Sequence, residues 1–122
     1  MSLLPRSPAV LVLERDPYWS PELQRRFRDE AVVVRSCRRL GDLDALLTEC
    51  DAAVVVLVLS ADPAGCLAWL ARRGTEVPVV VLGSPESVGL EPMFRSVGAT
   101  SFQAEVIAGG DLARLCRGLL RA

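Results

Sequence analysis

The sequence predicts an α/β domain in which a parallel sheet of five strands is covered by helices on both faces. Short valine-rich apolar runs recur along the chain without polar alternation, which is typical of strands buried on both faces. Segments with leucine at helical spacing separate these runs. Because parallel neighbours need crossover connections, this alternation of strand and helix favours a doubly wound sheet.

The run over residues 52–59 predicts the central strand. It is apolar throughout, and it is far shorter than the roughly 20 apolar residues that a bilayer-spanning helix needs. The other predicted strands are shorter runs of the same character: 9–13, 31–34, 78–82 and 100–103. We expect the strand at 31–34 near an edge of the sheet, and the strand at 100–103 is the weakest of the set.

Three helix starts are predicted where a capping residue precedes proline, at Ser20, Asp62 and Ser84. Serine and aspartate accept hydrogen bonds from the free N–H groups of a first helical turn, and proline suits the first helical position. These side chains also lie near the predicted ligand-binding edge, but capping explains them better than catalysis does. Asp42 is the predicted N-cap of the helix between the second and third strands.

The later helices differ in regularity. Gly89 and Pro92 disfavour a helix interior, so the helix after the fourth strand is expected to begin near Glu91 and to be short. The final helix, after residues 109–111, is amphipathic, with leucines on one side and arginines on the other. In the third helix, Trp69 lies off the main apolar face and is expected to be a boundary residue.

Five strands in a chain of this length fit the flavodoxin-like order 2-1-3-4-5. Ligands of such sheets bind beyond the carboxyl ends of the strands, where the strand order switches between strands one and three. Function is therefore expected in four segments that follow strands: 14–16, 56–60, 83–84 and 104–105.

The composition limits the function. The 122 residues fit one domain, which we place at 9–122, after an N-terminal extension at 1–8 that we expect to be flexible. The net charge of −1 argues against a nucleic-acid or membrane partner. The chain has neither lysine nor histidine, which removes Schiff-base chemistry and the commonest catalytic base, so we expect that it is not an enzyme.

The cysteines and the first residues indicate a compartment. The four cysteines are scattered without a paired motif, and the N-terminal residues lack the apolar core of a signal peptide. We therefore expect a cytoplasmic protein with reduced thiols, no zinc site and no cofactor.

Four segments, in matching order and spacing, resemble the receiver domain of bacterial response regulators in two-component signal transduction. V-L-E-R-D-P at 12–17 is similar to the family's V-D-D-x-P, and D-A-A-V-V-V-L at 51–57 is similar to its D-x-V-L-L-D. P-V-V-V-L-G-S at 78–84 resembles P-V-I-x-L-T-A, and V-G-A-T-S-F at 97–102 resembles A-G-A-D-D-Y. The resemblance covers nearly the whole chain and implies the CheY-like form of the fold.

The resemblance also implies a phosphorylation site that this sequence has lost. In the family, an acidic pair holds Mg²⁺, an aspartate accepts the phosphoryl group, and a Ser or Thr and a lysine contact the phosphate. The matching positions form a vestigial pocket: Glu14, Arg15 and Asp16 for the acidic pair, Val56 or Leu57 for the acceptor, Gly83 with Ser84 for the hydroxyl, Glu105 for the lysine, and Phe102 for the aromatic switch. We therefore expect a degenerate receiver, or pseudo-receiver, that takes up no phosphate.

The expected function is a protein-interaction or signalling module that is independent of phosphorylation. The last predicted helix reaches the end of the sequence, so we expect a stand-alone domain that acts by binding an unknown protein partner. Receivers signal through the face of the fourth helix, fifth strand and fifth helix, and opposite charges on this face suit a homodimer about a twofold axis. The candidate interface residues are Glu91, Arg95, Glu105, Arg114, Arg117 and Arg121.

An anion or small-molecule sensor that uses the vestigial pocket is the alternative. Its candidate ligands are Arg15, Arg38 and Arg39, with solvent-exposed arginine as the other interpretation of each. Tyr18 and Trp19 follow the first strand at the same edge. They are either an anchor for a partner or a staple on the first helix.

Overall fold

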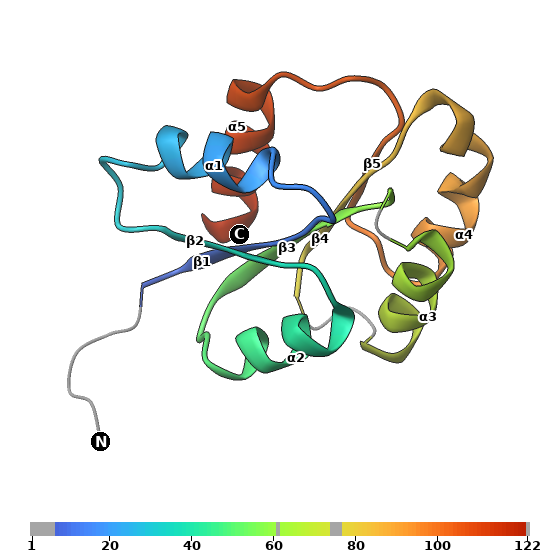
Figure 1. Cartoon of the computed structure of the whole chain (residues 1–122), viewed down its shortest axis with the longest axis horizontal. Helices are drawn as coiled ribbons and strands as arrows, with labels where there is room; N and C mark the ends of the chain where they lie inside the picture. The colour runs from blue at the N-terminus through green and yellow to red at the C-terminus, as the bar shows by residue number, and fades with distance from the viewer. Residues whose placement is uncertain (1–6, 61, 74–76, 122) are drawn as a thin grey trace.

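The computed structural model describes residues 7–60, 62–73 and 77–121, and it contains one parallel sheet of five strands in the order β2-β1-β3-β4-β5 (Figure 1). The strands are β1 (Ala9–Leu13), β2 (Val33–Cys37), β3 (Ala53–Val58), β4 (Val79–Leu82) and β5 (Ser101–Gln103). Every neighbouring pair is parallel, which confirms the predicted flavodoxin-like sheet. Of the predicted extension at 1–8, residues 1–6 lie outside the described part of the chain.

Helices cover both faces of the sheet (Figure 1). One layer holds α1 (Trp19–Arg26) and α5 (Gly109–Arg121). The opposite layer holds α2 (Leu40–Thr48), α3 (Pro63–Arg73) and α4 (Glu91–Ser96). Within the described ranges, no helix has the length and apolar character needed to cross a bilayer.

The central strands belong to two hydrophobic cores at once. β1, β3 and β4 are buried along their lengths, apart from half-buried Val58 at the carboxyl end of β3. Odd-numbered residues of β1 and β3 contact the α2–α3–α4 layer, and even-numbered residues contact the α1–α5 layer. Both faces therefore need apolar side chains, which explains the absence of polar alternation in the sequence.

Two predicted helix starts are wrong. α1 begins at Trp19, so Ser20 lies inside the helix and is not its N-cap. α2 begins at Leu40, and Asp42 lies in its first turn. The prediction for Asp62 is confirmed, because its Oδ1 accepts a hydrogen bond from the backbone N–H of Gly65 at 3.0 Å. For α1, the first-turn N–H groups are bonded instead by the Glu14 carboxylate, described below.

β2 begins later than the apolar run at 31–34 predicts, and it continues through Arg35 to Cys37. Its edge position is confirmed. Val34 is buried while Val33 and Arg35 are exposed, so one side of this strand faces solvent. An edge strand of this kind tolerates arginine, and its end is therefore not marked by the end of the apolar run.

The short fourth helix is confirmed, and a 3₁₀ helix, η1 (Pro85–Leu90), precedes it. Ser84 stands at the start of η1, as its position before proline predicts. The hydroxyl of Ser87 fixes this start: it accepts a hydrogen bond from the backbone N–H of Ser84 and donates one to the Ser84 carbonyl, both at 2.8 Å.

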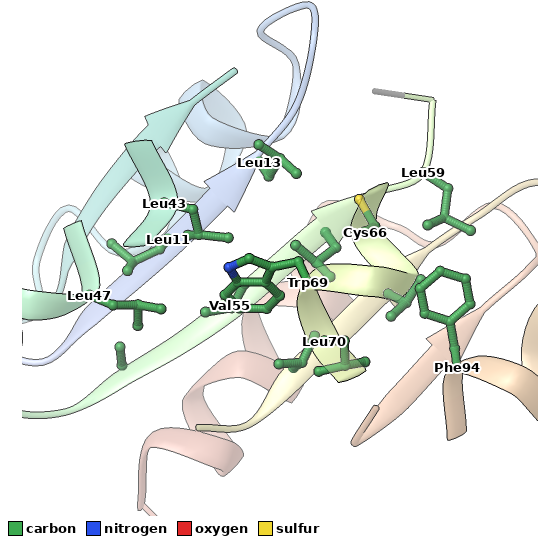
Figure 2. Packing of buried hydrophobic residues seen from close by; sticks show 14 of the residues in the cluster. Leu11, Leu13, Leu43, Leu47, Val55, Leu59, Cys66, Trp69, Leu70 and Phe94 are labelled. Atoms are coloured by element: carbon green, nitrogen blue, oxygen red, sulfur yellow. The ribbon is translucent and has the colours of Figure 1, made fainter. Parts of the chain in front are cut away.

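Trp69 is not the predicted boundary residue, because its side chain is fully buried. Figure 2 shows the indole ring next to Val55 of β3, with Leu43 and Leu47 of α2 on the same side of the ring. The indole Nε1–H donates a hydrogen bond to Asp44 Oδ1 on α2 at 2.8 Å, and the Arg73 guanidinium lies 5.8 Å from the ring centroid. The contact between α2 and α3 thus buries a large aromatic side chain and satisfies its polar atom.

We expect Cys66 and Cys116 to resist alkylation in the folded protein. Both thiols are fully buried, and burial raises the pKa of each to about 12, so little thiolate is present at mildly alkaline pH. Mass spectrometry after iodoacetamide treatment should detect labels at these positions only in denaturant. Labelling of the native protein at the rate seen for the unfolded chain would contradict this packing.

Candidate functional site

The strand register brings Val58 of β3 level with Glu14. Leu13 of β1 pairs with Leu57 of β3, and the same register continued by one residue brings Glu14 beside Val58. Val56 and Leu57, the two predicted positions, lie deeper in the strand and are fully buried. Val58 is apolar, as are Val56 and Leu57, so the tip of β3 offers no carboxylate next to Glu14.

Glu14 is almost fully buried, and its carboxylate caps the first turn of α1. The backbone nitrogen of Trp19 lies 3.0 Å from both carboxylate oxygens, that of Ser20 lies 3.0 Å from Oε2, and the N–H of Tyr18 donates to Oε1. A helix N-terminus presents unpaired N–H groups with partial positive charge, which suits a buried carboxylate. This contact explains why α1 begins at Trp19.

The residues at this edge do not fit the Mg²⁺ site that the fold implies. Mg²⁺ requires oxygen ligands in near-octahedral geometry. The Glu14 carboxylate is occupied by backbone N–H donors, Val58 has no ligand atom, and Arg15 adds a positive charge to the same turn. Asp16 is exposed, and in the described residues no three acidic or cysteine side chains form a group that could hold a metal.

Gly83, after β4, stands at the position predicted for the family's Ser or Thr, so it supplies no hydroxyl there. A Cβ atom at Gly83 would lie 2.1 Å from Ser87 Oγ, so a serine or threonine at position 83 would require Ser87 to move. Ser87 Oγ is itself bonded to the backbone of Ser84. The hydroxyl nearest to the family's phosphate-binding position therefore serves the start of η1.

Two shallow hollows open at the carboxyl ends of β3 and β4. The first has a volume of about 180 Å³ and lies toward α1 and the loop before α5; we call it the edge hollow. The second has a volume of about 290 Å³ and lies toward α3. Val58, Leu82, Gly83 and Ser84 line both, and no arginine of the described part of the chain lines either. Of the described residues in the lining of the edge hollow, Glu105 is the one that carries a charge.

Aromatic residues stand on both sides of this edge. Phe102 is buried against Phe94 of α4, with ring centroids 5.7 Å apart, so the aromatic switch position is filled by a core side chain. Trp19 is half-buried and lines the edge hollow, whereas its neighbour Tyr18 is 66% exposed. The two rings pack edge to face, 4.9 Å apart. Trp19 therefore packs against the core of the α1–α5 layer, whereas Tyr18 presents its ring to solvent.

Several of the candidate interface residues form ion pairs within the chain. Glu91 and Arg95 pair with each other along α4 at 2.6 Å. Arg117 donates two hydrogen bonds, at 2.7 and 2.9 Å, to Glu30 beyond the end of α1. The bond from Arg117 lowers the pKa of the Glu30 carboxyl. Arg117 therefore faces α1 and is already paired within the chain.

The remaining arginines of the candidate sites are exposed. On α5, Arg114 lies 3.7 Å from Asp111 in an exposed ion pair, and Arg121 is exposed. Arg38 and Arg39 are exposed in the connection between β2 and α2. Arg15 is exposed in the turn after β1. The predicted anion ligands thus lie on the β1–β2 side of the edge, away from the lining of either hollow.

Sequence reasoning did not identify Val58 and Ser87 as site residues. The spacing of Ser84 and Ser87 is that of a capping box, which could have identified the second serine. Val58 has no comparable signal, because it is one apolar residue in a continuous run and only strand pairing fixes its neighbour.

Together, the sheet order, the two helical layers and the vestigial edge define the class: the chain has the fold of a response-regulator receiver domain. The receiver domain of TorR, the response regulator of the TMAO respiratory system, superposes with a TM-score of 0.79 at 15% identity over 93% of this chain and 96% of that one. HP1043, an orphan response regulator of H. pylori, gives a TM-score of 0.78 at 17% identity over 97% of this chain and 100% of the other.

The CheY-like protein tadZ from Pseudomonas aeruginosa PAO1 gives a TM-score of 0.71 at 22% identity and covers 92% of this chain and 98% of its own. The sequence matches no protein-family model and no curated protein. At these identities the likeness is one of fold, and it confirms the predicted receiver architecture.

Proposed function

We propose that this chain is a pseudo-receiver, a degenerate receiver domain that acts as a protein-interaction module without phosphorylation. The observation that carries the proposal is the apolar tip of β3, where Val58 lies beside Glu14. Formation of an aspartyl phosphate needs an acceptor carboxylate and a divalent metal that neutralises the developing charge. The described residues at this edge supply neither a free acidic pair nor an acceptor.

Phosphodonor experiments test the proposal. The protein is incubated with Mg²⁺ and either acetyl phosphate or beryllofluoride, and a receiver that is modified under the same conditions serves as positive control. We expect no added mass in intact-protein mass spectrometry and no shifts of the backbone NMR signals of Glu14, Val58 or Gly83. Stoichiometric phosphorylation, or a beryllofluoride response at these positions, would overturn the proposal.

The proposed role is binding rather than catalysis, in the cytoplasm and with a protein rather than nucleic acid or membrane. The absence of lysine and histidine and the net charge of −1 support it. The buried cysteines add support, since burial raises the pKa of Cys66 and Cys116 and disfavours a nucleophilic thiolate. The anion-sensor alternative has less support, because its arginines line neither hollow.

A homodimer through α4, β5 and α5 is the second part of the proposal. Val88 of η1 and Met93 of α4 are 57% and 48% exposed, so these two helices present apolar surface to solvent. Arg114 and Arg121 are exposed on α5, and Glu105 is exposed in the loop that leads to it. An isologous contact would bring the acids of one copy to the arginines of the other.

Sedimentation velocity over a range of concentrations measures this dimer. We expect Met93→Glu to weaken association by about tenfold, because it places a charge in an apolar contact. Val33→Glu, at an exposed position on the edge strand β2, is the matched control and should leave association unchanged. A parent protein that stays monomeric at high concentration would remove the homodimer while leaving the phosphorylation result untouched.

A further inference from the structure

The edge hollow is an apolar recess with one carboxylate at its wall. Trp19, Val58, Leu82 and Ile107 supply apolar surface from α1, β3, β4 and the loop before α5. Glu105 lies in the same lining and is exposed. Among the residues that the structure describes, no basic side chain forms an ion pair with Glu105. The recess therefore has a negative charge that the fold itself does not neutralise.

The recess is smaller than the pockets that usually bind whole small-molecule ligands. Pockets for drug-sized ligands usually measure about 300–1,000 Å³. The edge hollow, at about 180 Å³, is closer to the size of one side chain. Its surroundings are also those of a contact surface, since Val106 in its lining is 98% exposed and Tyr18, packed against Trp19, is 66% exposed. Exposed apolar side chains around a recess are typical of protein-binding sites.

We propose that the edge hollow receives a lysine or arginine side chain of a partner protein, with its charged end on Glu105 and its methylene stem against Val58, Leu82 and Trp19. This inference rests on the proposed function and names the chemistry of the partner. Long basic side chains cover apolar surface with their stems while their charged ends stay hydrated or paired.

The edge hollow would prefer a cation, whereas the phosphate site of a receiver binds an anion. In the receiver family, which this fold resembles, the same edge is expected to accept an anion with help from a lysine. Here Glu105 is the residue predicted for that position, and among the described residues no arginine lines the recess. A carboxylate beside apolar walls repels phosphate and attracts a cation, so the preferred partner segment carries a basic residue next to an apolar one that covers Val106.

The test uses N-acetyl-arginine methylamide, whose one charge is the guanidinium, as the NMR probe of the full chain. We expect saturable shifts of the Trp19 indole and of the backbone amides of Glu105 and Val106. Glu105→Gln should weaken binding by about fivefold. Asp29→Asn, in the exposed loop after α1, is the matched charge-removing control and should bind as the parent does.

Three results would overturn the inference: no saturable shift at these residues, unchanged binding by Glu105→Gln, or equal binding of the uncharged probe N-acetyl-norleucine methylamide. Inorganic phosphate should cause no shift at Glu105, and a phosphate shift there in place of an arginine shift would also count against it. The phosphodonor experiment is independent. A protein that remains unmodified there but fails to bind the arginine probe retains the proposed function and loses only this partner chemistry.

Discussion

Glu14→Gln is expected to lower the free energy of unfolding by about 1–3 kcal/mol, the usual cost of leaving buried polar groups unsatisfied. The backbone nitrogens of Tyr18, Trp19 and Ser20 all direct their N–H groups at the Glu14 carboxylate. Glutamine keeps the volume but replaces one acceptor oxygen with a donor NH₂ group. The amide also lacks the charge that the helix N-terminus favours. Urea unfolding followed by circular dichroism measures the change.

Glu105→Gln is the matched control for this prediction. Glu105 carries the same functional group at the same edge but is exposed, so the substitution should change stability by no more than about 0.5 kcal/mol. Comparable stability of Glu14→Gln and the parent protein would show that the carboxylate does not hold the start of α1. Backbone amide exchange at Trp19 and Ser20 gives a local readout, since both should exchange faster in Glu14→Gln.

Trp69→Ala is expected to cost about 3–5 kcal/mol, the largest single effect among the substitutions considered. The indole is fully buried between α2, α3 and the sheet (Figure 2). Its removal leaves a cavity in the α2–α3–α4 layer and deprives Asp44 of the indole hydrogen bond. Thermal or urea unfolding measures the loss, and the variant is expected to be only marginally stable.

Trp69→Phe separates packing from the hydrogen bond. It keeps most of the apolar volume but removes the Nε1–H group, so its cost should be well below that of Trp69→Ala. Val88→Ala, at an exposed position, should have little effect on stability. An alanine variant as stable as the parent protein would mean that Trp69 lies at the surface, as the sequence pattern alone indicates.

The fold was predictable because its main signals are local. Each buried strand is an uninterrupted apolar run, and Asp62 and Ser84 mark helix starts through the proline that follows them. The start of α1 was not predictable in the same way. Its cap, Glu14, lies at the end of β1, and a carboxylate that follows a strand gives no sign that it will turn back onto the next helix.

The location of the site could be predicted from the sequence, but the register of β3 relative to β1 could not. The segments after β1, β3, β4 and β5 could be assigned to one edge from the order of the strands alone. Which residue of β3 lies beside Glu14 depends on pairing, and a continuous valine-rich run fits several registers equally well. The prediction for Trp69 failed for a related reason. The hydrogen-bond partner of its buried indole, Asp44, comes from a different helix.

The cap that Glu14 places on α1 has a consequence for how such a module would be controlled. The Glu14 carboxylate fixes the first turn of α1, which borders the edge hollow, so this side of the hollow forms as soon as the chain folds. Binding there would be constitutive, with occupancy set by the concentrations of the chain and its partner. Under the proposed function, regulation would fall on synthesis and degradation of the protein, on timescales much longer than those of phosphoryl transfer.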